Sequence, residues 1–323
     1  MALINTWLTD RFDLALPVVA ATMAGVADGR FAAAATRAGI LGGIGVGGAA
    51  SGGWITEQAA VAEGPYAIGL QLWGLADHPD QFEATLAARP TMVSLSFGDP
   101  TPYVEQCHQA GIVVVSQVGT TTAARAAVDA GVDAIVARGG EGGGHGVDQV
   151  ATLPLLQSVL EVVDVPVIAA GGIATARGLA AVLAAGAAGA WIGTAFTTCV
   201  ESTLPDDAVA LLAAAGEDRT AFGKVFDIAQ RTGWPTEFGG RALINSFTER
   251  WTGQEDRLAA DASALDRFAA ARDARDPEVL PVWAGQGAGL LDGRRRPISD
   301  IVDELGEAAG LLRSAAEQVG QEP

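Results

Sequence analysis

The sequence is poor in cysteine, in basic residues and in aromatic residues. Cys107 and Cys199 are too few for a disulfide framework and share no metal-ligand spacing, so we expect inert thiols, no metal site and a protein of the reducing cytoplasm. The 20 Lys and Arg residues stand against 38 Asp and Glu residues, which gives a formal net charge of -18. Nucleic acid is therefore excluded as a partner, because phosphate backbones are bound by clustered cations.

Long uncharged runs are also missing, and the opening residues MALINTWLTD lack the basic start and apolar stretch of a secretory signal. We expect neither a membrane-spanning nor an exported protein. Apolar residues are nevertheless plentiful: they make up 49% of the 323 residues, enough for one large core with a smaller appendage. Nothing in the composition indicates the number of subunits.

Short runs rich in Val, Ile and Leu alternate with Ala-rich stretches that end in glycine, a pattern typical of successive βα units. The short runs are continuously apolar, as expected of parallel strands that are buried on both faces. Eight strands are the number that closes a barrel, and strands are predicted at 14–21, 39–46, 66–72, 91–97, 111–118, 132–138, 165–172 and 187–194.

The choice between a (β/α)8 or TIM barrel and an open doubly wound sheet depends on where polar and glycine-rich residues fall. They follow the C-terminal ends of many predicted strands. In a barrel those ends meet at one rim, whereas an open sheet would spread them along an edge. The sequence therefore predicts an α/β protein, with a TIM barrel formed by 1–204 and 281–323.

Residues 205–280 depart from the βα pattern because charged residues become frequent there. Three stretches have helical character: DDAVALLAAAGE, GRALINSFTERW and DASALDRFAAARDARD. We expect a smaller helical insertion after strand eight that covers the active-site side of the barrel. The amphipathic stretch 299–319 is predicted as the helix that closes the barrel.

Two glycine-rich turns follow the seventh and eighth predicted strands, at the usual phosphate-binding position of barrel enzymes. The first contains Ala170, Gly171 and Gly172, and the second contains Gly193 and Thr194. Glycine lets a phosphate approach the backbone and accept hydrogen bonds from amides at a helix start. One such cluster alone would more often be a tight turn, but the matched pair favours a phosphate held by backbone amides, since neither loop has a Lys or Arg.

The stretch RGGEGGGHGVD, residues 138–148, places three consecutive glycines next to one of only three histidines. Glycines let the backbone lie flat against a planar ligand. In the same pocket, the imidazole of His145 can take a proton from a carbon or nitrogen acid or stabilise a negative oxygen. A flexible loop that happens to contain a histidine is the alternative. Arg138, Glu141 and Asp148 could each orient His145 or lie solvated at the rim, and we single out Glu141 as the partner to test.

These segments resemble one known family. EGGGHG is similar to the Glu-Ala-Gly-Gly-His pattern of nitronate monooxygenases, formerly called 2-nitropropane dioxygenases, and VIAAGGIATARGLAAVLAAGAAGAWIGTAF resembles their segment from strand seven to strand eight. The similarity extends to LPVVAATMAGVADGRFAAAATRAGILGGIG and to WAGQGAGLL, and it leaves out roughly 205–280. The resemblance implies a TIM barrel that binds FMN non-covalently and an oxidoreductase that oxidises alkyl nitronates with O2 to carbonyl compounds and nitrite.

The resemblance also implies roles for individual residues. His145 would be the catalytic base or would assist electron transfer from substrate to flavin. Residues after strands one, three, five and six would contact the flavin, and residues after strands seven and eight would hold its phosphate. The implied FMN-binding residues are Thr22, Met23, Ala24, Gln71, Gln117, Gly143, Gly144, Ala170, Gly171, Gly172, Gly193 and Thr194, with Trp73 as a further candidate.

Gln117 departs from the family pattern, because many relatives carry a lysine there. A lysine beside the N1–C2 carbonyl edge of the flavin would favour the anionic reduced form, so Gln117 should lower the reduction potential. Three aromatic residues of the insertion, Phe226, Trp234 and Phe238, would wall the pocket and select an apolar substrate, or would be ordinary core residues.

Three alternatives stay open. An FMN-dependent NAD(P)H reductase of enoyl thioesters or quinones has the same family shape and needs no dinucleotide fingerprint, because the nicotinamide stacks on the flavin. The second alternative is a barrel that binds FMN without catalysing a reaction. Loss of activity in His145→Ala with retained FMN would argue against it. A non-flavin barrel enzyme with a phosphorylated substrate would be colourless and would not take up FMN.

Overall fold

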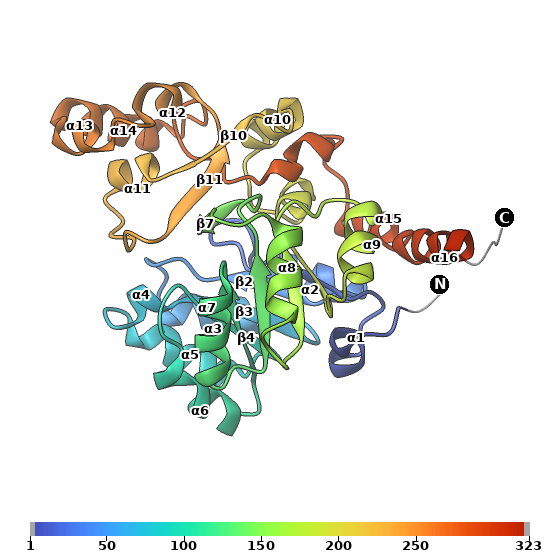
Figure 1. Ribbon diagram of the computed structural model, residues 1–323. Coiled ribbons are helices and arrows are strands. Elements are labelled where there is room, and N and C mark those ends of the chain that lie inside the picture. Colours follow the sequence, from blue (N-terminus) through green and yellow to red (C-terminus); the bar gives the residue numbers. More distant parts are fainter. Residues whose placement is uncertain (1–3, 320–323) are drawn as a thin grey trace.

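The computed structural model describes residues 4–319, and residues 1–3 and 320–323 of the predicted barrel ranges lie outside the described residues. Parallel strands form one sheet in the order β1-β9-β8-β6-β5-β4-β3-β2, at the centre of the molecule (Figure 1). Each strand falls inside its predicted range. The strands are β1 (Val18–Ala20), β2 (Gly42–Gly45), β3 (Tyr66–Gln71), β4 (Met92–Ser96), β5 (Val113–Val118), β6 (Ala134–Arg138), β8 (Val167–Ala170) and β9 (Gly189–Ile192).

The sheet closes on itself between its first and last strands. The backbone N–H of Ala20 donates to the carbonyl of Leu41 at 2.9 Å, and the N–H of Leu41 donates to the carbonyl of Val18 at 3.0 Å. Parallel strands joined by helices and closed in this way form a (β/α)8 barrel. The prediction of a TIM barrel is confirmed.

Helices connect the strands and cover the outside of the barrel. Four of them follow the capping residues Asp28, Ser51, Thr120 and Thr175, whose side chains accept hydrogen bonds from backbone amides of the first turn. The helices between the strands are α2 (Gly29–Arg37), α3 (Gly52–Val61), α4 (Leu72–Leu75), α5 (Pro79–Ala88), α6 (Thr101–Gln109), α7 (Thr121–Asp129), α8 (Thr152–Leu160) and α9 (Ala176–Ala184).

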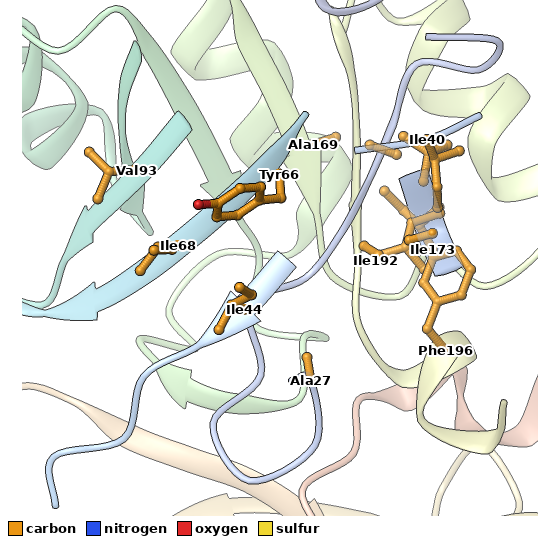
Figure 2. Packing of buried hydrophobic residues seen from close by; sticks show 14 of the residues in the cluster. Ala27, Ile40, Ile44, Tyr66, Ile68, Val93, Ala169, Ile173, Ile192 and Phe196 are labelled. Atoms are coloured by element: carbon orange, nitrogen blue, oxygen red, sulfur yellow. The ribbon is translucent and has the colours of Figure 1, made fainter. Parts of the chain in front are cut away.

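The core has two layers, one outside and one inside the barrel. Outside, Ile44, Ile68 and Val93 are register partners on three neighbouring strands and belong to the cluster packed under the helices (Figure 2). Inside, a second cluster fills the barrel. Helix α1 (Trp7–Phe12), which the sequence did not predict, contributes Leu8 to that inner cluster. Leu8 lies against Gly189 at the start of β9, so α1 closes the N-terminal end of the barrel.

The insertion is not wholly helical. GRALINSFTERW, predicted as one helix, contains strand β11 before its helix, and β11 pairs antiparallel with β10 and with β7 (Gly144–Gly146). β11 pairs with a segment that lies far away in the sequence, so the helix propensity of its own residues could not predict that it is a strand. The elements are α10 (Asp206–Ala214), β10 (Thr220–Gly223), α11 (Val225–Gln230), β11 (Gly239–Leu243), α12 (Ser246–Trp251), α13 (Glu255–Ala260) and α14 (Ala262–Ala274).

The insertion has its own core and lies on one side of the barrel, with β7 between the two (Figure 1). After it come the short 3-10 helix η2 (Gln286–Leu290), which contacts η1 (Thr194–Thr198), and two final helices, α15 (Ile298–Leu305) and α16 (Ala308–Val319). The prediction of a single closing helix over 299–319 is wrong, because α15 ends at Leu305, directly before Gly306, a residue with poor helix propensity. None of the described helices is long and apolar enough to span a bilayer.

Candidate active site

A cavity of about 910 Å³ lies at the C-terminal ends of the barrel strands. This volume is near the top of the usual range for ligand pockets, about 300–1,000 Å³, and so has room for a cofactor and a substrate together. Every residue predicted as catalytic or FMN-binding lines the cavity: Thr22, Met23, Ala24, Gln71, Gln117, Gly143, Gly144, His145, Ala170, Gly171, Gly172, Gly193 and Thr194. The barrel rim brings them together, as parallel strands of a closed sheet require.

The two turns predicted to hold a phosphate lie side by side because β8 and β9 are paired. Within residues 4–319, the backbone amides of Gly171, Gly172, Gly193 and Thr194 donate to no backbone carbonyl. Gly171 and Gly172 have φ angles of 107° and 69°, in the left-handed region that favours glycine. Unpaired amides that line a cavity are the donors a phosphate monoester needs, so this rim fits the phosphate of a flavin mononucleotide.

Arg138 supports the glycine loop from the end of β6. Its side chain is buried and donates hydrogen bonds to the carbonyl oxygens of Val147 at 2.9 Å and Gly144 at 3.0 Å, and also to that of Gly142. Burial, together with the nearby Arg241, lowers the pKa of Arg138 to about 10. The role that the sequence left open for Arg138 is therefore to hold the loop that carries the histidine.

Packing within the protein explains why two of the three consecutive glycines lack side chains. A Cβ on Gly142 would lie 2.7 Å from Nε of Arg138, and a Cβ on Gly143 would lie 2.6 Å from the backbone nitrogen of Gly285. Gly144 differs, since its φ of 66° requires glycine although a Cβ there would meet nothing within 4 Å. Close contact with the chain itself is thus sufficient to require glycine at positions 142 and 143.

His145 is the middle residue of β7 and is held on several sides. Its backbone pairs with Gly240 of β11, and its carbonyl oxygen accepts a hydrogen bond from Nε2 of Gln117 at 3.2 Å. The indole of Trp234 stacks on the imidazole with ring centroids 3.7 Å apart, and Trp283 contacts it at 4.8 Å. The imidazole therefore has a defined orientation in the cavity and is not carried by a flexible loop.

The side-chain partner of His145 is Asp227, a residue of α11 that the sequence did not single out. Nε2 of His145 lies 2.8 Å from Oδ1 of Asp227. The choice of Glu141 as the partner is wrong, because its carboxylate accepts a hydrogen bond from the backbone N–H of Thr152 at 3.3 Å, at the start of α8. The only sequence signal for Asp227 is an isolated acid in the apolar stretch VFDIAQ.

The aromatic residues of the insertion have different positions. Trp234 lines the cavity, as does Trp73 of the barrel, and their ring centroids are 5.0 Å apart. Phe238 packs on Phe97 at 5.3 Å, and Phe226 is buried in the core of the insertion. The sequence left open whether these aromatic residues of the insertion line the pocket or belong to the core. Trp234 lines the pocket, and Phe226 is a core residue.

Two buried serines were also missed. Ser94 and Ser96 line the cavity with their hydroxyl oxygens 2.9 Å apart, and Ser96 accepts a hydrogen bond from the backbone N–H of Gln117 at 3.0 Å. Their spacing of two in an otherwise apolar strand places both side chains on one face, which is the signal that could have revealed them. Residues 4–319 contain no cluster of three His, Cys, Asp or Glu side chains suited to a metal ion.

The sequence is similar to oxidoreductases with several names. The family model described as nitronate monooxygenase matches residues 54–307. A nitronate monooxygenase of Paraburkholderia phytofirmans is 32% identical, in a match that covers 94% of this chain and 94% of that protein. A protein of Rhodococcus jostii is 32% identical over 84% of this chain and 75% of its own length, and is named (3aS,4S,5R,7aS)-5-hydroxy-7a-methyl-1-oxo-octahydro-1H-indene-4-carboxyl-CoA dehydrogenase.

Two solved structures resemble the whole chain. FabK from Thermotoga maritima superposes with a TM-score of 0.83 and 27% identity, and the match covers 98% of both chains. Nitroalkane oxidase from Streptomyces ansochromogenes superposes with a TM-score of 0.78 and 28% identity, covering 96% of this chain and 99% of that one. With nearly full coverage, the likeness includes the insertion as well as the barrel.

Proposed function

This chain belongs to the nitronate monooxygenase family and is an oxidoreductase, and we propose that it uses FMN to oxidise alkyl nitronates with O2 to carbonyl compounds and nitrite. One observation carries the proposal: an oriented imidazole, His145, lines the same cavity as the unpaired amides that follow β8 and β9. An acid–base group and a phosphate cradle on one rim are what a flavin enzyme of this kind needs.

The residues of the rim divide between the two ends of FMN. The amides of Gly171, Gly172, Gly193 and Thr194 would bind the phosphate, and polar side chains such as Gln71 would face the ring. The bound flavin supplies the electron acceptor that no side chain of the chain provides. In this scheme Nη1 and Nη2 of Arg138 are bonded to the glycine loop, and only its Nε is left without a partner among the described residues.

His145 would hold or move the proton. Nε2 is bonded to Asp227, so Nδ1 is the ring nitrogen that can accept a proton from a neutral nitroalkane. Once protonated, the same nitrogen can donate a hydrogen bond to an oxygen of a nitronate. Trp73 and Trp234 give the pocket an apolar wall that excludes water around the substrate.

The test begins with the absorbance spectrum of the purified protein and identification of the bound flavin by mass. The protein is then mixed anaerobically with propyl-2-nitronate and, separately, with NADPH. We expect the nitronate to bleach the flavin and, in air, to release nitrite. A colourless protein that takes up no FMN would contradict the cofactor, and a flavin that NADPH alone reduces would contradict the substrate.

A second function is favoured by the size of the cavity and by the likeness to FabK. A cavity of about 910 Å³ exceeds what a small nitroalkane needs beside a flavin, and the fold is shared over 98% of both chains. The second candidate is therefore an FMN-dependent NAD(P)H reductase of enoyl thioesters or quinones. Rapid anaerobic bleaching by NADPH, followed by reoxidation with an enoyl thioester or a quinone, would support it.

A further inference from the structure

The His145–Asp227 pair joins the barrel to the insertion within the active site. His145 comes from β7 and Asp227 from α11, and their side chains are only 12% and 10% exposed. The distance of 2.8 Å between Nε2 and Oδ1 is that of a charge-assisted hydrogen bond. A pair so well shielded from solvent is stronger than the same contact on the surface.

The second carboxylate oxygen of Asp227 shows that the pair is isolated from other charges. Oδ2 of Asp227 is buried and has no hydrogen-bond partner among the described residues. Asp227 also forms no ion pair with any lysine or arginine of residues 4–319. The nearby Arg138 is bonded to carbonyl oxygens of the glycine loop, and Asp77 and His78 are the other ionisable residues of the cavity lining. His145 is therefore the group that compensates the carboxylate.

The pair determines which ring nitrogen carries the proton. A carboxylate only accepts hydrogen bonds, so Nε2 must be protonated. Nδ1 makes no hydrogen bond with residues 4–319 and is not among the buried atoms that lack a partner, so it faces accessible space. Turning the ring over by 180° would put a carbon in the place of Nε2 and break the bond to Asp227, and Trp234, stacked on one ring face, hinders that rotation.

We propose that Asp227 is a positioning residue that holds His145 in the Nε2–H form, so that Nδ1 serves as the base toward neutral nitroalkanes. This inference rests on the proposed function, which supplies the substrate and the base role of His145, and it adds the residue that determines which ring nitrogen acts. Nδ1 takes the proton from the α-carbon, the electron pair of the C–H bond stays on the substrate as the nitronate, and the imidazolium formed is stabilised by Asp227. No oxidant is needed for this step.

The first measurement needs no variant. In the ¹⁵N-histidine-labelled protein as isolated, long-range ¹H–¹⁵N NMR at pH 8 distinguishes the two neutral forms of each ring, and the His145 signals are those lost in His145→Gln. We expect His145 to be protonated at Nε2. His108, whose Nε2 lies 3.0 Å from Oδ2 of Asp133 with both side chains more than a third exposed, is the solvent-exposed comparison within the same spectrum. A neutral His145 protonated at Nδ1 would overturn the proposal.

The second measurement compares kcat/KM of Asp227→Asn with a neutral nitroalkane and with its nitronate. General-base catalysis typically contributes about 10²–10⁴-fold, so we expect a loss of at least about 100-fold with the nitroalkane and less than about 10-fold with the nitronate. Asp273→Asn makes the same charge change at an exposed position of the insertion and should change neither value. Equal losses with both substrates would indicate a merely structural role and contradict the proposal.

The two hypotheses fail in different ways. If neither substrate is oxidised while His145 is protonated at Nε2, the proposed function fails and the positioning by Asp227 stands. If nitronates are oxidised while His145 is protonated at Nδ1, the proposed function stands and the role of Asp227 fails.

Discussion

Trp234 lies face to face on His145, with ring planes only 5° from parallel. The indole comes from the loop after α11, whereas the imidazole belongs to a strand that follows the sixth strand of the barrel. Together with Asp227, Trp234 makes the insertion a direct part of the surroundings of the imidazole. The insertion is thus more than a cover, because it contributes a wall and a hydrogen-bond partner to the candidate active site.

Replacing Trp234 should change binding more than folding. In Trp234→Ala the apolar wall of the cavity is lost, and water gains access to His145, so we expect KM for short alkyl nitronates to rise by about tenfold, the effect of about 1.4 kcal/mol. Trp234→Phe keeps an aromatic ring on the imidazole and should show a smaller change. Steady-state kinetics at constant FMN occupancy measures both. An unchanged KM in Trp234→Ala would show that the indole does not bound the substrate.

Removing the imidazole should separate catalysis from cofactor binding. His145→Ala is expected to keep its flavin, because the amides after β8 and β9 are untouched, and to lose at least about 100-fold in kcat/KM with nitroalkanes. His108→Ala, on the exposed surface of α6, is the matched control. Flavin content and initial rates are measured on the same preparations. Full activity in His145→Ala would remove this residue from the mechanism.

The charge at position 117 should tune the reduction potential. Gln117 lines the cavity and is uncharged, so Gln117→Lys adds a cation that favours an anionic reduced flavin and should raise the midpoint potential. Gln117→Met removes the hydrogen bond to the His145 carbonyl without adding charge, and should leave the potential closer to that of the parent. Spectroelectrochemical titration reports the values. A potential in Gln117→Lys no higher than in the parent would contradict the hypothesis.

Arg138 should matter for stability. In Arg138→Met the carbonyls of Gly142, Gly144 and Val147 lose their buried donor, and each unpaired group costs about 1–3 kcal/mol, offset in part by removing a buried charge. We expect a net loss of about 2–4 kcal/mol in the free energy of unfolding, measured by urea denaturation. Arg30→Met, where the side chain is 81% exposed, should change it by less than about 0.5 kcal/mol. Equal stabilities of the two variants would count against the support of the loop by Arg138.

The barrel could be predicted from sequence because its signals are local. Continuous apolar strands followed by glycine or polar residues determine both the sheet and its functional rim, and residues as distant as Thr22 and Thr194 were correctly expected on that rim. Strand β11 and the partner Asp227 could not be predicted in this way. Both are defined by contacts with β7, and a single sequence carries no local mark of a partner so far along the chain.

The pairing of β7 with β11 has a consequence for the order in which parts of the molecule fold. His145 and Asp227 are 82 residues apart along the chain, and closing so long a loop costs entropy that neighbouring βα units do not pay. During synthesis the strands up to β9 emerge before α11 and β11 exist. We therefore expect the imidazole to acquire its carboxylate after β6 has paired with β8, so that a nascent or half-refolded chain can already have its glycine turns while His145 still lacks its hydrogen-bond partner.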